Sequence, residues 1–229
     1  MKIKITLTIA FFFQIILAQK LNIIYPERFL NLEFDCYSKS ILEPKDLRLF
    51  ALFHETLFEK GEQFYYPNFI MSTRNSQGDY KFVFMEKDKT KLPQGIRSQL
   101  IIQFPRLGSK YYYFHDSTRV KPNDIVSSIH YAIDSGRIDG NLFKKEYIKY
   151  YANENCIKIS FEKEYQGSVI FPYLANVFIL PDSYKINKTD YAKHPVGSGP
   201  FQYDEKTDED NLYLTFFDKY HTQENFDSI

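Results

Sequence analysis

Two histidine–carboxylate pairs are the residues of this chain best suited to acid–base chemistry. Glu55 directly follows His54, and Asp116 directly follows His115. A general acid or base must reach the proton that it transfers, and adjacent residues on a helix do not face each other. The sequence contains no nucleophile elbow, zinc-binding helix motif or pair of carboxylates at a catalytic spacing. It therefore predicts that the protein is not an enzyme, with a hydrolase as the weakest alternative, which a hydrolase screen would test.

The cysteines and histidines do not form a metal-binding pattern. Cys36 and Cys156 lie far apart in the sequence, whereas cysteine ligands of a metal come in close pairs. An oxidising compartment would permit a disulfide between them, and two separate buried thiols are an equal alternative. The five histidines, none at ligand spacing, are His54, His115, His130, His194 and His221. We expect no metal and no cofactor.

A segment rich in proline and glycine, His-Pro-Val-Gly-Ser-Gly-Pro-Phe, occupies residues 194–201. Pro195 and Pro200 each fix a backbone angle, while Gly197 and Gly199 permit angles that other residues avoid. A glycine loop that cradles phosphate would instead lead into a helix, usually with a lysine directly after it. Because a β-like run follows here, the segment is predicted to be a structural corner. It should return a strand to the sheet that the N-terminal segment began.

The charges of the chain balance, with 29 lysine and arginine residues against 29 aspartate and glutamate residues. A balanced chain has no net field to attract nucleic acid or an anionic membrane surface, so nucleic acid is not an expected partner. Apolar residues make up 44% of the 229 residues and charged residues 25%. These values are typical of a globular protein and exclude a disordered or fibrous chain.

The N-terminus has the pattern of a secretory signal. Lys2 and Lys4 precede an apolar run at residues 5–18. The run includes Gln14 and falls short of the roughly 20 apolar residues that a membrane span needs. We expect residues 1–18 to be a cleavable signal peptide and the mature protein to be periplasmic or extracytoplasmic. The run is not followed directly by a cysteine that would carry a lipid anchor.

The elements that must position these residues follow from periodicity. The clearest helix, at residues 121–134, has its apolar residues on one face. Pro122 and Asp124 suit its start, and Gly136 suits a left-handed stop. Further helices are predicted at residues 46–58, 143–151 and 168–175. Strands are predicted at residues 21–25, 79–85, 99–104, 110–114, 156–161, 201–203 and 212–216.

Four stretches, in this order, resemble motifs of the peptide-binding class of bacterial extracellular solute-binding proteins. The two longer ones are residues 114–132, which begin Phe-His-Asp-Ser-Thr-Arg, and residues 194–201, similar to the family's "NPVGTGPY" turn. Residues 52–57 are similar to its "YEGL" helix and residues 217–220 to its "NPDYW" close. The departures from these patterns are Thr56 and Ser117 in place of glycines and His221 in place of a tryptophan.

The resemblance implies an α/β fold, the N-terminal lobe of a periplasmic-binding-protein-like clamshell. It implies a discontinuous sheet-containing lobe at residues 19–45 and 156–229, with an inserted α+β subdomain at residues 46–155. Family members continue past the "NPDYW" region into a second lobe, and we expect that lobe to be missing here. The positions that match structural parts of the motifs are His115, Asp116, Asp124, His194, Pro195, Val196, Gly197, Gly199 and Pro200.

The resemblance also implies the exported substrate-binding component of an ABC import system. The expected ligand is a peptide or other small solute, and the expected partners are a membrane permease and a separately encoded second lobe. Because two lobes close over a ligand in this family, one lobe should bind weakly or not at all. By chain position, Leu42, Glu43 and Pro44 are our prediction for the rim of the cleft. The alternative is a secreted protein-interaction module that reuses the lobe, and the downstream reading frame would distinguish the two.

Overall fold

The computed structural model describes residues 20–22, 35–37, 44–62, 65–67, 83–104, 112–186, 191, 194–207 and 212–220. The predicted signal peptide at residues 1–18 lies outside these residues, as do Leu42, Glu43 and His221. The expectations that rest on them stay predictions.

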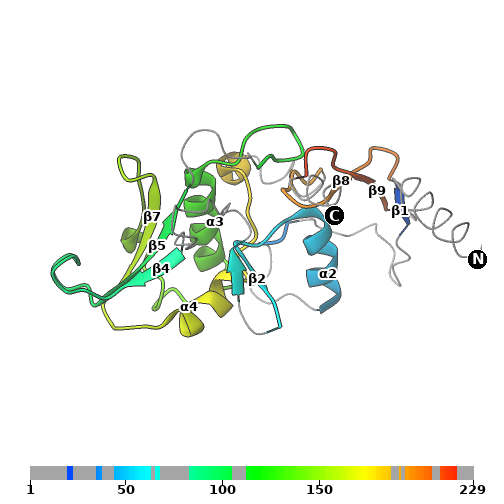
Figure 1. Ribbon diagram of the computed structural model, residues 1–229. Helices are drawn as coiled ribbons and strands as arrows, with labels where there is room; N and C mark the ends of the chain where they lie inside the picture. The colour runs from blue at the N-terminus through cyan, green and yellow to red at the C-terminus, as the bar shows by residue number, and fades with distance from the viewer. Residues whose placement is uncertain are drawn as a thin grey trace, which may run out of the picture.

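Helices are interspersed with groups of short strands along the chain (Figure 1). Within the described residues the helices are α2 (Pro44–Phe53), α3 (Pro122–Asp134) and α4 (Gly167–Leu174), with 3₁₀ turns η2 (Lys145–Tyr147) and η3 (Asp182–Lys185). The strands are β1 (Lys20–Asn22), β2 (Phe58–Lys60), β3 (Tyr65–Pro67), β4 (Val83–Glu86), β5 (Ser98–Gln103), β6 (Ile148–Tyr151), β7 (Cys156–Phe161), β8 (Phe201–Tyr203) and β9 (Tyr213–Phe216). Among these helices, none is long and apolar enough to cross a membrane.

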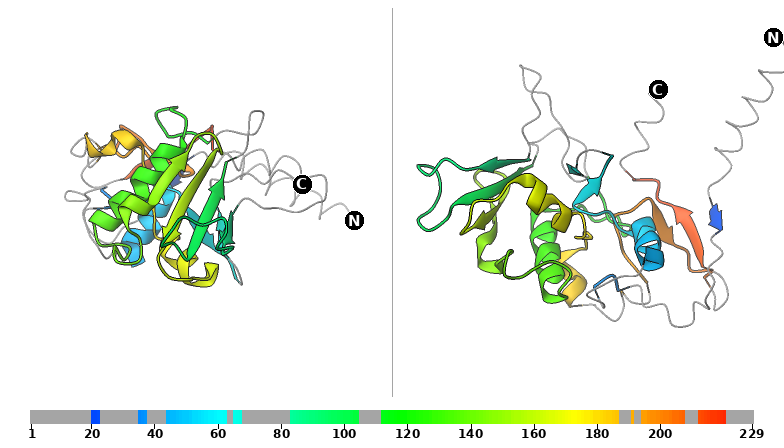
Figure 2. Two further views of the ribbon diagram at one scale, coloured as in Figure 1. Left: turned by 90° about the vertical axis from the view of Figure 1, so that its left-hand side faces the viewer. Right: turned by 90° about the horizontal axis from the view of Figure 1, so that it is seen from below.

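The larger sheet is antiparallel, with the strand order β4-β5-β7-β6. Leu100 of β5 pairs with Ile159 of β7, and both side chains are fully buried. Helix α3 packs on this sheet, as Figures 1 and 2 show, and contributes Ile125, Ile129 and Ala132 to the same core. Burial of these apolar side chains holds the helix to the sheet.

The ends of α3 follow the sequence prediction. Pro122 is its first residue, and the Asp124 carboxylate accepts a hydrogen bond of 2.6 Å from the Lys121 backbone N–H. Gly136, just after the helix, has a φ of 71°, the left-handed conformation that stops a helix. Both signals therefore have the predicted structural roles.

A second sheet, which we call the smaller sheet, has the order β1-β9-β8 and is also antiparallel, while β2 and β3 pair in a separate two-stranded sheet. Lys20 of β1 lies opposite Thr215 of β9, and Phe216 of β9 lies opposite Phe201 of β8. This pairing confirms that the strand after the corner joins the sheet begun by the N-terminal segment. Its core contains Leu49 and Phe53 of α2 together with Leu212 and Leu214. The two sheets lie toward opposite ends of the molecule (Figures 1 and 2).

Two local predictions of helix are wrong. Residues 143–151 form η2 and the strand β6, in which buried Ile148 and exposed Lys149 begin an alternation of period two. The helix predicted to reach residue 58 ends at Phe53, because the Leu57 N–H donates to the Val177 carbonyl (2.8 Å) and the chain leaves the helix for that segment. In the first case pairing with the next strand, β7, overrides the helical tendency, and in the second case a contact with the distant Val177 segment does.

The strand at 156–161 forms as predicted, but its neighbours differ from the expected ones. It pairs with β5 and β6 of the 46–155 segment, whereas the prediction placed it with the N-terminal sheet. An alternating pattern predicts a strand and not its partners, which explains the difference. The division into a lobe at residues 19–45 and 156–229 with an inserted subdomain stays a prediction, and this pairing favours a second boundary after β7.

Candidate functional site

Four segments that are distant in the sequence meet beside the end of α2. We call them together the corner cluster: residues 53–55, 114–119, 194–201 and 217–220. The 194–201 segment contacts each of the others through backbone hydrogen bonds, which are Gly199 N–H to Phe53 O (2.8 Å), His115 N–H to Gly197 O (2.9 Å) and Phe217 N–H to Pro200 O (2.9 Å). Every segment belongs to one of the motif stretches found in the sequence.

His115 fixes both glycines of the reversal with its ring. The Gly197 N–H donates to Nδ1 (3.1 Å), and Nε2 lies 3.0 Å from the Gly199 carbonyl oxygen. Because Nδ1 accepts, the ring proton sits on Nε2, which donates to that oxygen. Burial, which disfavours the imidazolium, lowers the pKa of His115 to about 4. The residue is therefore a neutral clamp at physiological pH.

Close packing, and not backbone angle, explains the two glycines. A Cβ on Gly197 would lie 1.8 Å from the Phe53 carbonyl oxygen, and one on Gly199 would lie 2.6 Å from the Phe53 carbonyl carbon. Neither glycine has a positive φ. The expectation that they supply unusual backbone angles is thus wrong, although the corner itself forms where it was predicted.

The residue that does adopt a left-handed backbone is Ser117, with a φ of 66°. It stands where the resembling family has a turn glycine, so a serine here occupies a conformation that favours glycine. Next to it, exposed Asp116 accepts hydrogen bonds from the N–H (2.9 Å) and hydroxyl (2.6 Å) of Thr118. Asp116 therefore stabilises the turn.

The remaining motif residues have distinct surroundings. His194 is exposed, with its ring 5.6 Å from that of Tyr203, and Pro195 is buried. Val196 packs, half-buried, against the main core. The structure thus brings residues 195–200 together with His115, while His194 faces outward. Pro44, the one described residue of the predicted rim, is the first residue of α2.

Asp124 acts outside the corner cluster, between α3 and η3. Its carboxylate accepts the Lys121 N–H at one oxygen and the Asp182 N–H (2.8 Å) at the other. Burial raises the pKa of Asp124, and these two backbone hydrogen bonds act in the opposite direction. The residue joins the start of the helix to the segment that precedes the reversal.

The first histidine–carboxylate pair lies under the reversal. His54 is 2% exposed and its ring lies among those of Phe50, Phe53 and Phe178; neither ring nitrogen has a hydrogen-bond partner. Burial lowers its pKa to about 3. The Glu55 carboxyl accepts a hydrogen bond from the Tyr220 hydroxyl, and burial raises its pKa to about 7.

Neither histidine ring forms a hydrogen bond with the carboxyl that follows it in the sequence. Both ring nitrogens of His115 are occupied by backbone groups, and His54 contacts aromatic rings.

The pairing of Glu55 with Tyr220, and the role of Ser198, were not found from the sequence. The Ser198 hydroxyl accepts from the Glu55 N–H (3.3 Å) and donates to the Ile179 carbonyl (3.4 Å). In the sequence, the only feature that could have drawn attention to Ser198 is its position between Gly197 and Gly199.

Cys36 and Cys156 are two buried thiols, the second of the alternatives left open by the sequence. Within the described ranges, no three histidine, cysteine, aspartate or glutamate residues lie close enough to hold a metal ion.

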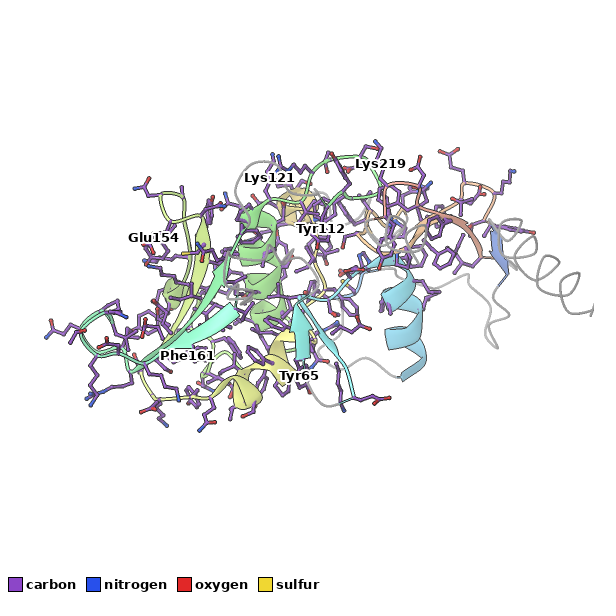
Figure 3. The ribbon with its side chains drawn as sticks, in the orientation of Figure 1. Tyr65, Tyr112, Lys121, Glu154, Phe161 and Lys219 are labelled. Atoms are coloured by element: carbon purple, nitrogen blue, oxygen red, sulfur yellow. The ribbon has the colours of Figure 1, made fainter. Side chains whose placement is uncertain are left out.

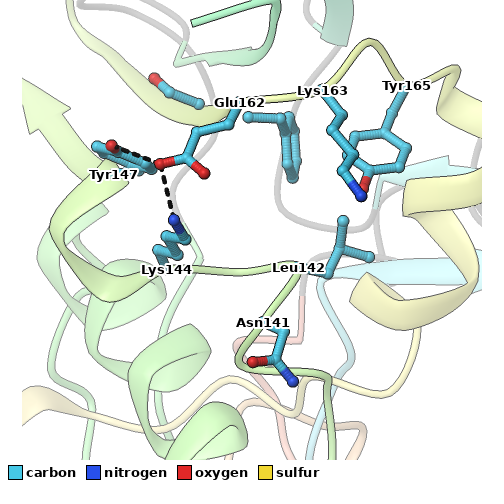
Figure 4. Close-up of a pocket in the computed structure, with 9 residues that line it drawn as sticks. Asn141, Leu142, Lys144, Tyr147, Glu162, Lys163 and Tyr165 are labelled. Carbon is cyan, nitrogen blue, oxygen red and sulfur yellow. Dashed lines mark hydrogen bonds and ion pairs between the residues drawn. The ribbon is translucent and has the colours of Figure 1, made fainter. Parts of the chain in front are cut away.

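A hollow of about 80 Å³ lies apart from the corner cluster, between residues 141–147 and the end of β7 (Figure 4). The Lys144 ammonium lies 2.7 Å from the Glu162 carboxylate, which also accepts from the Tyr147 hydroxyl at 3.0 Å. The Lys144 and Glu162 charges of this hollow thus pair with each other. Ligand sites commonly measure about 300–1,000 Å³, so this hollow is too small for a peptide.

Comparison with known proteins gives a family match. The model of bacterial extracellular solute-binding proteins, family 5 Middle, matches residues 110–229, which include most of the corner cluster. The curated proteins contain no match to the sequence.

Solved structures share the fold at low sequence identity. Listeria monocytogenes OppA bound to peptide matches with a TM-score of 0.60 and 15% identity, over 84% of this chain and 38% of that one. AgaA from A. tumefaciens R10, in complex with agropinic acid, matches with a TM-score of 0.59 and 19% identity, over 83% of this chain and 34% of that one. NikZ from Campylobacter jejuni, in complex with Ni(L-His), matches with a TM-score of 0.54 and 16% identity, over 82% of this chain and 34% of that one. The chain therefore spans about a third of the length of these proteins.

Proposed function

Because the chain belongs to family 5 of the bacterial extracellular solute-binding proteins, we propose that it is the exported substrate-binding component of an ABC import system for peptides. The family binds solutes and is not enzymatic. The observation that carries the proposal is the convergence of all four motif segments on one corner cluster, with the reversal fixed by His115 and Phe53. This rigid corner supports a lobe of the clamshell type.

Peptide is the proposed solute class because the sequence motifs resemble those of the peptide-binding members. Proteins of this fold bind different solutes, since the solved ones hold a peptide, agropinic acid or a nickel–histidine complex. Peptide-binding proteins can hold the ligand backbone as an added strand, which tolerates varied side chains. The rim at Leu42, Glu43 and Pro44 remains our proposed ligand contact. A membrane permease and a second lobe are the proposed partners, with the protein periplasmic or extracytoplasmic.

We expect the protein alone to bind peptide weakly or not at all. A site that buries most of its ligand needs a wall on each side, and this chain covers 34–38% of the length of the similar solved proteins. Isothermal titration calorimetry of the purified protein with tri- and tetrapeptides should show a Kd weaker than about 100 μM. The control is L. monocytogenes OppA with the same peptides. A Kd below about 1 μM for this protein would contradict the one-wall proposal.

The solute class needs a second measurement, because calorimetry of weak binding gives too little heat to rank different solutes. Amide NMR spectra should be recorded with tripeptide, agropinic acid or Ni(L-His), each at millimolar concentration. Peptide should shift a localised set of resonances, while the other two solutes leave them unchanged. If peptide causes no shifts, or if either of the other solutes causes larger ones, peptide is the wrong class.

A further inference from the structure

Residues 217–220, which we call the strap, contact the other three segments of the corner cluster through side chains as well as through the backbone bond to Pro200. The edge of the Phe217 ring faces His115, with 5.0 Å between ring centroids. The Lys219 ammonium donates to the Ser117 hydroxyl (2.9 Å) and lies 5.7 Å from the centroid of Tyr113; Figure 3 labels this lysine. The strap is thus held against the 113–117 segment and the reversal.

Tyr220, the last residue of the strap, contacts the carboxyl of Glu55. The Tyr220 hydroxyl donates to Glu55, directly after the histidine beneath the reversal. Burial is the largest influence on the pKa of Glu55 and raises it to about 7. The Tyr220 hydrogen bond lowers this pKa, and the charge of Glu59 in β2 raises it. The other titratable neighbours are Tyr112, whose own pKa the Glu55 charge raises, and His54.

We propose that Glu55 is a proton-dependent anchor of the strap. Its neutral carboxyl holds residues 217–220 on the other three segments of the corner cluster, and its ionisation favours their release. The proposal goes beyond solute binding and holds whichever solute the protein takes. Glu55 is a positioning residue in this role, because it acts through Tyr220 on the chain that follows β9.

The direction follows from linkage between protonation and the position of the strap. With the strap in place, the carboxyl is buried and holds its proton up to a pKa of about 7. When Tyr220 lifts away and water reaches Glu55, its pKa returns toward the ordinary value for glutamate, about 4.3. The closed strap is therefore most stable at low pH and loses this stabilisation as the pH rises through 7.

The size of the effect follows from the same two values. Full hydration of Glu55 on release would favour the open strap at most about 100-fold more at pH 8 than at pH 5. His54 and His115 do not contribute over this range, because burial holds the pKa values of both near or below 4. The Lys219 ammonium, the other charged group of the strap contacts, binds the Ser117 hydroxyl.

Hydrogen exchange of the Phe217 amide tests the proposal, because this N–H donates to Pro200 only when the strap is closed. Its protection factor, corrected for the intrinsic exchange rate, should fall between about 10- and 100-fold from pH 5 to pH 8. In Glu55→Gln, whose amide cannot ionise, the protection factor should be equal at the two values of pH. The Leu57 amide, bonded to Val177, is the internal control and should keep its protection.

An equal fall in Glu55→Gln would overturn the proposal, as would constant protection in the unmodified protein. A direct titration keeps the test valid if the variant does not fold. The carboxyl ¹³C resonance of Glu55 in the unmodified protein should titrate near pH 7. A midpoint below about 5, close to that of a hydrated glutamate, would also overturn it.

Discussion

At the residue scale, Gly197 lies where the reversal passes closest to the end of α2. A methyl group at this position would meet the Phe53 carbonyl oxygen, which already accepts the Gly199 N–H. Backbone atoms cannot move aside as the end of a flexible side chain can. We therefore expect Gly197→Ala to lower the free energy of unfolding by about 3 kcal/mol or more, measured by urea denaturation.

Gly140→Ala is the matched control for that substitution. Its Cβ would lie 3.2 Å from the end of the Ile133 side chain, which can adjust. The change should cost less than about 1 kcal/mol. Equal losses in the two variants would show that close packing at the reversal is not the reason for Gly197.

Residue types in the reversal predicted where the chain turns but not why. Pro195, Gly197 and Gly199 located the corner in the sequence, yet the reason for the glycines is the proximity of Phe53, more than a hundred positions away. The role of His115 was also hidden, because a histidine in a turn does not reveal which carbonyl or N–H its ring will meet. Side-chain partners of this kind depend on the tertiary fold.

At the scale of elements, Asp124 connects the start of α3 to η3. Asparagine at this position keeps one acceptor oxygen but turns a donor toward the second backbone N–H. We expect Asp124→Asn to cost about 1–2 kcal/mol of unfolding free energy in urea denaturation.

The control lies at the other end of the same helix. Asp134, whose side chain is 55% exposed, pairs with Lys145. An exposed ion pair contributes about 0–1 kcal/mol, so Asp134→Asn should have little effect. A loss as large as that of Asp124→Asn would indicate that charge along the helix, and not the pair of backbone bonds, accounts for the stabilisation.

Elements with strong local signals were predictable, and those decided by strand pairing were not. Helix α3 has Pro122 at its start and Gly136 after its end, and the structure bears both out. At residues 143–151 the apolar spacing favoured a helix, but pairing with β7 imposes a strand. The partners of β7 were missed for the same reason, because register and strand order depend on the whole fold.

At the scale of the whole molecule, buried His54 and half-buried His115, whose pKa values burial lowers, make stability sensitive to acid. The folded-state pKa of His54 is about 3 and that of His115 about 4, both below the ordinary value near 6.5. The unfolded chain therefore binds protons first as the pH falls. Their contribution is complete above pH 6.5 and is lost progressively toward pH 4, whereas Glu55, with a raised pKa, contributes the opposite slope.

His54→Leu should remove one of these contributions. Leucine matches the aromatic surroundings and has no nitrogen that lacks a partner. We expect the loss of unfolding free energy between pH 7 and pH 5, measured by urea denaturation at each pH, to shrink by about 2 kcal/mol. His194→Leu, at an exposed position, should leave the pH dependence unchanged. A similar change in both variants would contradict the assignment to the buried ring.

The pairing of β1 with β9 has a consequence for the order in which the protein acquires its structure. Lys20 and Thr215 are neighbours in the smaller sheet, so nearly the entire chain forms the loop between them. Closing so long a loop carries an entropic cost that only later contacts offset. During synthesis the ribosome releases the first strand long before its partner exists. The four-stranded sheet can assemble meanwhile, and the three-stranded sheet must wait until β9 has been synthesised.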